Sequence, residues 1–221
     1  MLKIYVVTFM LFVVVCSCSQ DIKKDTVAES QTEDTIAGFQ IEPKLDLEKT
    51  GKKAREALAF CKQKNMNTQF CILIDMELHS GLNRFLVWDF KKDTLKYSFP
   101  VSHGCCSLSW GDDQSKENPT FSNQEGSHCS SLGKYKLGKR GYSDWGVNVK
   151  YLMHGLESTN KNALSRYIVF HAWDMVSDNA TYPNGTPEGW GCPAISNKNF
   201  KLIDPLLQKA DKSVLMWIYE N

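Results

Sequence analysis

Short apolar runs separated by long polar connections limit most strongly what this chain can fold into. The runs at 70–74, 84–90, 94–99, 133–137, 165–171 and 213–219 are rich in β-branched and aromatic residues, which favour strands. The connections, above all residues 102–145, are rich in Gly, Ser, Asn and Asp. Connections of such length in a compact domain usually carry function. The pattern predicts a mainly-β domain whose site lies in its loops.

Two helical segments interrupt this β pattern. Apolar residues recur at i, i+3, i+4 and i+7 from Ala54, which predicts an amphipathic helix at the start of the domain. Near the other end, Ser196 is a good N-cap for a second helix, and the Asp204-Pro205 pair predicts that this helix restarts or kinks. We therefore expect a mainly-β fold with a few short helices plus an N-terminal helix.

The first 43 residues do not belong to this fold. Lys3 precedes an apolar run over 4–15 that ends in small residues, which is typical of an export signal and too short for a membrane-spanning helix. Val15-Cys16-Ser17-Cys18 resembles the bacterial lipoprotein cleavage box, which predicts a signal peptide over 1–17 and a lipid on Cys18. Cys16, behind the bulky Val15, is the weaker candidate. A plain cleaved signal or an uncleaved anchor is the alternative.

Residues 18–43 are polar and mixed in charge, so they predict a flexible tether to a domain over 44–221. The predicted location is the cell envelope, with the lipid anchor in the outer membrane and the domain facing the periplasm. The formal net charge of +1, with no basic stripe, gives no reason to expect a nucleic-acid partner. The sequence does not predict a particular protein partner.

Six cysteines lie beyond the export segment: Cys61, Cys71, Cys105, Cys106, Cys129 and Cys192. In an exported chain they allow a disulfide framework. The tight spacing in 103–106 and 128–129 does not fit zinc motifs, so we expect no metal and no other cofactor. A disulfide between either Cys105 or Cys106 and Cys129 is favoured over a metal site, and reduced loop thiols remain the other interpretation.

The candidate catalytic nucleophile is Cys192, in the segment Gly189-Trp190-Gly191-Cys192-Pro193. Glycines let the backbone turn tightly and approach a substrate, and the amides of Gly191 and Cys192 could then hold an oxyanion. His171, at the end of a predicted strand, is the imidazole nearest in sequence and the candidate base for the thiol. A disulfide cysteine and a buried core histidine are the alternatives.

These residues also carry a family resemblance. Gly191-Cys192-Pro193-Ala194, together with 169–172, resembles the signature of L,D-transpeptidases of the YkuD-like class, in the subfamily with Pro-Ala after the cysteine. Further segments resemble the subfamily in the same order along the chain: 74–75, 101–104, 121–123, 130–135 and 154–157, with Asn160 and Arg166. The resemblance spans roughly residues 70 to 200.

The resemblance implies a β-sandwich-like L,D-transpeptidase catalytic domain that acts on peptidoglycan stem peptides. Cys192 would form a thioester at an L-centre and pass the acyl group to an amine or to water, with His171 moving the proton. It also implies substrate contacts at His103, Ser130 and Ser131, and Trp190 flanks the site. The sequence departs from the commonest pattern, Ser-His-Gly-Cys followed by an arginine, at 189, 190 and 194.

Two other functions stay open at this stage. A papain-like endopeptidase is disfavoured because its cysteine precedes its histidine, whereas here His171 precedes Cys192. A lipoprotein that keeps the fold but only binds the cell wall is the main alternative, since the departures at 189, 190 and 194 affect the site itself.

Overall fold

The computed structural model describes residues 44–220. The predicted signal peptide, the lipidation of Cys18 and the tether therefore lie outside the described residues. Within the described range, no helix is long and apolar enough to cross a bilayer.

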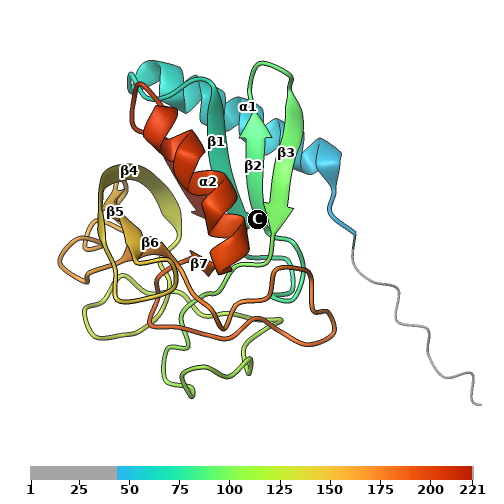
Figure 1. Cartoon of the computed structure of the whole chain (residues 1–221), viewed down its shortest axis with the longest axis vertical. Coiled ribbons are helices and arrows are strands. Elements are labelled where there is room, and N and C mark those ends of the chain that lie inside the picture. The colour runs from blue at the N-terminus through green and yellow to red at the C-terminus, as the bar shows by residue number, and fades with distance from the viewer. Residues whose placement is uncertain (1–43, 221) are drawn as a thin grey trace, which may run out of the picture. The chain divides into compact units, whose positions relative to one another are not determined.

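One eight-stranded sheet and two helices form the domain (Figure 1). The strands lie side by side in the order β3-β2-β1-β8-β4-β5-β6-β7. In chain order the elements are α1 (Leu47–Gln63), β1 (Phe70–Asp75), β2 (Phe85–Asp89), β3 (Thr94–Phe99), β4 (Gly133–Tyr142), β5 (Val149–Gly155), β6 (Val169–Ala172), β7 (Ala194–Ile195), α2 (Asn197–Lys209) and β8 (Leu215–Tyr219). The predicted mainly-β class is confirmed.

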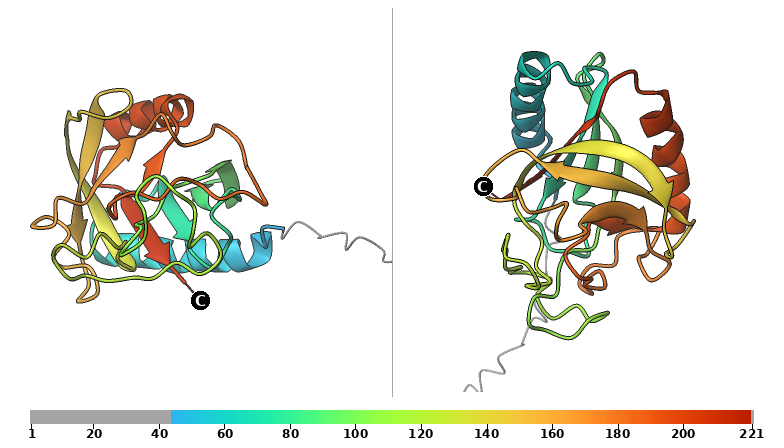
Figure 2. Two further views of the ribbon diagram at one scale, coloured as in Figure 1. Left: turned by 90° about the horizontal axis from the view of Figure 1, so that it is seen from below. Right: turned by 90° about the vertical axis from the view of Figure 1, so that its left-hand side faces the viewer.

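The sheet is continuous but strongly turned, because β4 and β5 run across the direction of β1 to β3 (Figure 2, right). The two helices cover opposite faces of it in the same view. Helix α1 packs on β1 and β8, and α2 packs on the other face, near β6.

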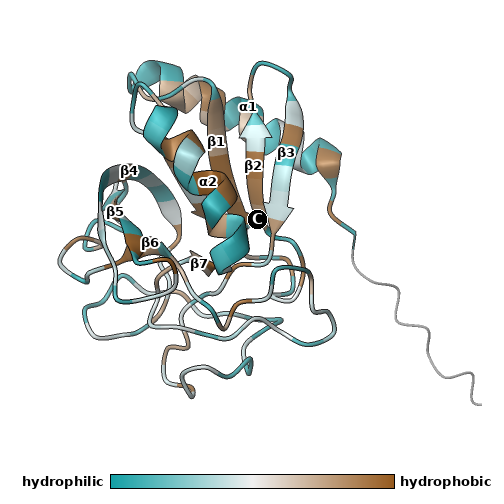
Figure 3. Ribbon diagram, in the orientation of Figure 1, coloured by the Kyte–Doolittle hydropathy of each residue, from teal (hydrophilic) through white to brown (hydrophobic). Residues whose placement is uncertain are grey.

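The interior strand β1 shows why the sequence predicts the core well. All six of its residues are buried, since both faces of this strand are covered (Figure 3). Ile72 and Ile74 face the larger apolar cluster beneath α2, whereas Cys71 and Leu73 face the cluster beneath α1. Burying each large apolar side chain contributes roughly 1.5–3 kcal/mol.

Both helices begin at a side-chain cap. Asp46 accepts hydrogen bonds from the first-turn amides of α1. Ser196 caps α2 as predicted, because its hydroxyl accepts from the Asn199 amide at 3.2 Å. The predicted restart at Asp204-Pro205 is wrong: α2 continues through Pro205, and the Asp204 carboxylate binds Arg140 and Tyr151 instead of capping.

Three strands differ most from the predictions. β7, of only two residues, was not predicted. Neither was β5, since its alternation of apolar and polar residues is weak. β6 begins at Val169 rather than at 165, and ends one residue after His171. The reason is a turn over 160–167 that closes with Tyr167 in the left-handed region, at φ 57°.

The two longest connections, residues 102–131 and 173–193, lie together at one end of the sheet (Figures 1 and 2). We call them the site loops. Gly104 and Gly189 form a parallel bridge between them, and the Glu188 amide donates to the Asp112 carbonyl at 2.7 Å. These bonds hold the segment before Cys192 against a distant part of the chain.

Candidate active site

The turn that carries Cys192 is held at its base by backbone pairing. The Gly189 amide donates to the His103 carbonyl, and the Cys105 amide donates to the Gly189 carbonyl, both at 2.7 Å. Gly191 has φ 97°, and a Cβ there would lie 2.5 Å from the Cys129 carbonyl oxygen. Only glycine fits at this position.

Two buried serines fix the same turn from the other site loop. The Ser130 hydroxyl donates to the Gly191 carbonyl at 3.2 Å and accepts from the Gly104 amide at 3.0 Å. The Ser102 hydroxyl accepts from the Ala194 amide at 3.1 Å and donates to the Cys192 carbonyl at 3.4 Å. Ser102 was not singled out from the sequence. Its only signal was a place in one of the ordered segments.

The Cys192 thiol is half-buried and rests on the backbone before β6. Its Sγ accepts a hydrogen bond from the Val169 amide at 3.3 Å and donates to the Tyr167 carbonyl at 3.8 Å. Burial raises the pKa of the thiol, while the Val169 N–H and the charges of Arg166 and Lys150 act in the opposite direction. The resting group is therefore a protonated thiol.

His171 lies in β6, in parallel register with Ala194 of β7, two residues beyond the thiol. Its Nδ1 lies 2.8 Å from the Ala172 carbonyl oxygen, which can only accept, so Nδ1 carries the proton and Nε2 is the free acceptor. Burial lowers the pKa of His171, so the imidazole is neutral near pH 7. The two side chains line one pocket without a direct hydrogen bond among the described residues.

That pocket is walled mainly by tryptophans: its lining residues are Ser102, Trp110, Trp145, His171, Trp173, Gly189, Trp190, Cys192 and Ala194. Trp190 is 58% exposed, and the His128 ring stacks on it with centroids 5.6 Å apart. The structure thus brings Trp190, His171 and Cys192 together. Within residues 44–220, the amides of Trp190, Gly191 and Cys192 form no hydrogen bond.

His103 lies next to the turn through its backbone, but its side chain points into the protein. Its side chain is fully buried, so it offers no surface to a substrate. Arg84 donates to its Nδ1 at 2.8 Å, so Nε2 carries the proton and donates to the Ser115 hydroxyl at 2.8 Å. The Ser115 hydroxyl in turn donates to the Glu188 carboxylate at 3.0 Å. This buried series of hydrogen bonds lies behind Gly189 and supports it. Its acidic residue, Glu188, was not predicted from the sequence.

Burial sets the charge states of the residues in this hydrogen-bonded series. Burial and the neighbouring Arg84 hold the pKa of His103 well below its usual range, so the imidazole is neutral. Burial lowers the pKa of Arg84 to about 9 and raises that of Glu188, although both bonds from Ser115 favour the carboxylate. The second Glu188 oxygen is buried without a hydrogen-bond partner among the described residues.

The two predicted serine contacts are occupied by the protein itself. Ser130 binds the turn, as described above, and only 1% of it is exposed. The Ser131 hydroxyl donates to the Ser122 carbonyl at 2.7 Å and accepts from Arg166 at 2.6 Å. Arg166 also donates to the Cys129 carbonyl at 2.6 Å. These serines hold backbone in this structure rather than face the pocket.

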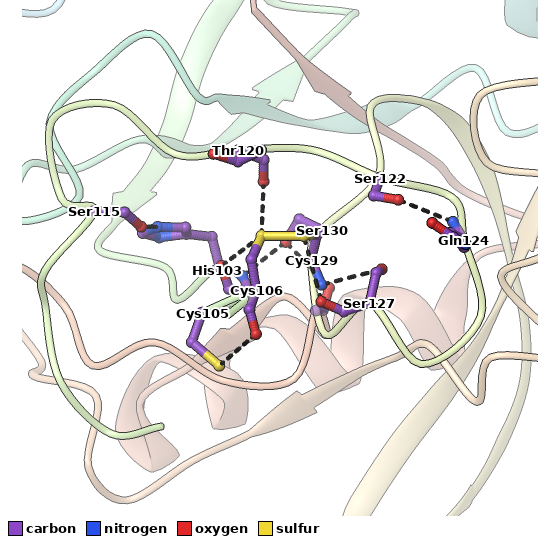
Figure 4. The surroundings of a disulfide bond; sticks show 12 residues. His103, Cys105, Cys106, Ser115, Thr120, Ser122, Gln124, Ser127, Cys129 and Ser130 are labelled. Atoms are coloured by element: carbon purple, nitrogen blue, oxygen red, sulfur yellow. Dashed lines mark hydrogen bonds between the residues drawn. A yellow bond between two sulfur atoms is a disulfide. The ribbon is translucent and has the colours of Figure 1, made fainter. Parts of the chain in front are cut away.

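A disulfide joins Cys106 to Cys129 directly beside Ser130 (Figure 4). Of the two interpretations left open by the sequence, the disulfide is the one observed for Cys106 and Cys129, while Cys105 remains a thiol. Cys105 is a buried free thiol, as are Cys61 and Cys71. Among the described residues, no group of three or more His, Cys, Asp or Glu side chains could hold a metal ion.

Comparison with known proteins identifies one family. The sequence matches the L,D-transpeptidase catalytic domain family over residues 42–219. Among curated proteins, no sequence matches the chain.

Several solved structures are similar. The helical cell shape determining protein Pgp2 of Campylobacter jejuni is 14% identical over 77% of this chain and 56% of its own, with a TM-score of 0.43. An L,D-transpeptidase of Xylanimonas cellulosilytica is 10% identical over 68% and 60%, with a TM-score of 0.35. One of Enterococcus faecium is 9% identical over 68% and 50%, with a TM-score of 0.39. The chain thus spans 50–60% of the length of these structures.

Proposed function

We propose that this chain, which belongs to the L,D-transpeptidase catalytic domain family, transfers acyl groups of peptidoglycan stem peptides through a thioester on Cys192. One observation carries the proposal. A half-buried thiol and a neutral imidazole of fixed tautomer line the same pocket, beneath a glycine turn whose amides are free within the described chain.

In the first step, the Cys192 sulfur attacks the carbonyl carbon of the L-centre that precedes a terminal D-residue. His171 Nε2 takes the thiol proton as the C–S bond forms. The amides of Gly191 and Cys192 hold the oxyanion. When the C–N bond breaks, the imidazolium returns the proton to the leaving amine, which leaves a thioester.

In the second step, an amine or water attacks the thioester, and the thiol leaves with the proton that His171 transfers. The resting thiol contacts Tyr167 and Val169 rather than His171. Rotation about the Cα–Cβ bond of Cys192 must therefore bring Sγ toward Nε2 when the substrate enters.

Intact-protein mass after incubation with a carbapenem tests the proposal, because an acylating β-lactam leaves a covalent adduct on an active thiol. We expect a one-to-one adduct on the wild-type domain, no adduct on Cys192→Ala, and an unchanged adduct on Cys61→Ala, which removes a buried thiol from α1. An adduct that persists in Cys192→Ala, or none on the wild type, would contradict the proposal.

His171→Ala tests the base separately. We expect turnover of a tetrapeptide stem to be abolished while thermal unfolding stays cooperative. Unchanged turnover would mean that another group takes the thiol proton.

A cell-wall-binding lipoprotein without catalysis is the second candidate. The raised pKa of the Cys192 thiol and its contact with Tyr167 rather than His171 favour it. It predicts binding of purified peptidoglycan without release of a D-amino acid, so the carbapenem experiment separates the two functions.

We further propose that the domain is lipid-anchored through Cys18, in the outer membrane, and faces the periplasm. The cleavage-box resemblance and the polar segment over 18–43 support this. Radiolabelled palmitate should label the full chain in bacterial cells. Labelling that survives Cys18→Ala would contradict the assignment of the anchor.

A further inference from the structure

The pocket beside Cys192 is unusual in its aromatic lining. Trp110, Trp145 and Trp190 are 43%, 44% and 58% exposed, although each would contribute more to stability if it were buried. A cluster of exposed apolar side chains at the same place is typical of a binding site. The lining points to a ligand group that stacks on indole rings.

The indoles form one continuous wall, which we call the indole wall: Trp110, Trp145, Trp173 and Trp190. Trp110 is its centre, with ring centroids 6.1 Å from Trp145, 5.3 Å from Trp173 and 6.1 Å from Trp190. They come from three connections of the chain, since only Trp173 and Trp190 share a site loop, so the wall exists only in the folded protein. A group bound on it lies next to the thiol, since Cys192 lines the same pocket.

The charges around the wall favour a cation. The indole face is the strongest aromatic partner for an ammonium group. No Lys or Arg lines the pocket. Asp144 and Asp174 directly adjoin Trp145 and Trp173 in the chain, are exposed, and form no ion pair or hydrogen bond within the described residues. Neither carboxylate lines the pocket, but each gives a negative charge to a segment that carries an indole.

Two basic residues near the thiol act against the binding of a cation in the pocket. Lys150 and Arg166 influence the Cys192 thiol, and Lys150 also acts on His171. Arg166 is bound to the Cys129 carbonyl and to Ser131, and Lys150 lies in β5. Both residues belong to segments that contribute no tryptophan to the wall. Neither Lys150 nor Arg166 lines the pocket beside the indoles.

We propose that the indole wall binds the alkylammonium group of an amine acyl acceptor, so that the thioester passes to an amine in preference to water. This rests on the proposed function. An alkylamine has a pKa of about 10.4 and arrives as an ammonium ion. Water gains nothing from the indoles, so only the amine is concentrated beside the thioester.

Protons balance in the transfer. The ammonium first loses one proton to solvent and becomes a neutral amine. Its nitrogen attacks the thioester carbonyl, and His171 Nε2 takes a second proton from the nitrogen as the C–N bond forms. The C–S bond then breaks, and this proton passes to Sγ, which regenerates the Cys192 thiol.

The ratio of aminolysis to hydrolysis tests the proposal, because both products arise from one acyl-enzyme and slow acylation does not alter their ratio. With a tetrapeptide donor and an alkylamine acceptor, Trp110→Leu should lower the ratio about threefold or more, and Trp110→Phe by less. Trp217→Phe is the matched control, since this indole contacts Lys53 and Lys134 outside the pocket. An unchanged ratio in Trp110→Leu would overturn the proposal.

Choline and its uncharged isostere 3,3-dimethylbutan-1-ol separate a cation site from an apolar one. Choline should quench the tryptophan fluorescence of the Cys192→Ala protein and inhibit aminolysis by the wild type, and the alcohol should do neither. Equal effects of both compounds, or no effect of choline, would overturn the proposal. Because the fluorescence measurement needs no turnover, it still decides the inference if the wild type forms no acyl-enzyme, which would count against the proposed function alone.

Discussion

The sheet and the site loops of this protein are held together in different ways. Around β1 and β2, apolar side chains pack on both faces of a regular sheet, in which β1 pairs with β2 and with β8. In the site loops the bonds are polar and join distant residues, such as the Thr186 hydroxyl to the Ser80 carbonyl at 2.6 Å and the Gly185 amide to Asp113 at 2.6 Å.

This difference explains how the protein positions its reactive side chains precisely. Apolar packing tolerates substitutions of similar volume, because it has little directional preference. A hydrogen-bonded loop tolerates few changes, since each buried donor or acceptor left without its partner costs free energy. The sheet provides stability, and the site loops place a thiol within a pocket.

Among the variants that test this comparison, Phe85→Ala should have the largest effect on the free energy of unfolding. Phe85 is fully buried in β2 and stacks between Phe99 and Phe170. We expect the free energy of unfolding to fall by about 3–5 kcal/mol, because the substitution leaves a cavity. Urea unfolding measures this. The rate of carbapenem acylation of the remaining folded protein should change little, and a large loss of that rate would break the comparison.

Removal of the disulfide should act on the site loops instead. Replacing both Cys106 and Cys129 by serine releases a link across 23 residues, which should lower the free energy of unfolding by roughly 3 kcal/mol. Amide hydrogen exchange should rise in residues 103–131 before it rises in β1. Cys105→Ser, which keeps the disulfide, is the control. Equal increases in both regions would show that the two do not differ in local stability.

Glu188→Gln should affect catalysis more than stability. The amide still accepts from Ser115, but the negative charge that faces His103 and Arg84 is lost. We expect about 2 kcal/mol less stability, and a fall in kcat at nearly constant KM because the turn before Cys192 loses its support. Glu157→Gln, whose carboxylate binds Lys134 away from the pocket, is the control.

The smallest effect concerns pH. Burial lowers the pKa of His171 below 6.5 and raises that of the Cys192 thiol above 9.0. Imidazole must be neutral to accept the thiol proton, so acylation should fall as the pH drops through the lowered pKa of His171. Stopped-flow acylation over pH 4 to 8 measures this. A midpoint above 6.5 would contradict the burial of His171.

The sequence predicted the sheet better than the site loops, for a physical reason. The apolar runs of β1, β2 and β8, and the cap Ser196, are local patterns. The sequence also brought His171 and Cys192 into one hypothesis, which the shared pocket supports. The pairing of Arg84 with His103 and Glu188 depends on the folded chain, because burial joins residues up to 104 positions apart.

The resting contacts of Cys192 have a consequence for how the protein can be attacked chemically. Oxidants and simple alkylating agents react with thiolates, and a sulfur that stays protonated between Val169 and Tyr167 reacts with them slowly. Selective reagents for this protein should therefore carry a strained carbonyl that the amides of 190–192 can polarise, and an apolar cationic group that covers the tryptophans. The same protonated state protects the nucleophile from oxidative damage while no substrate is bound.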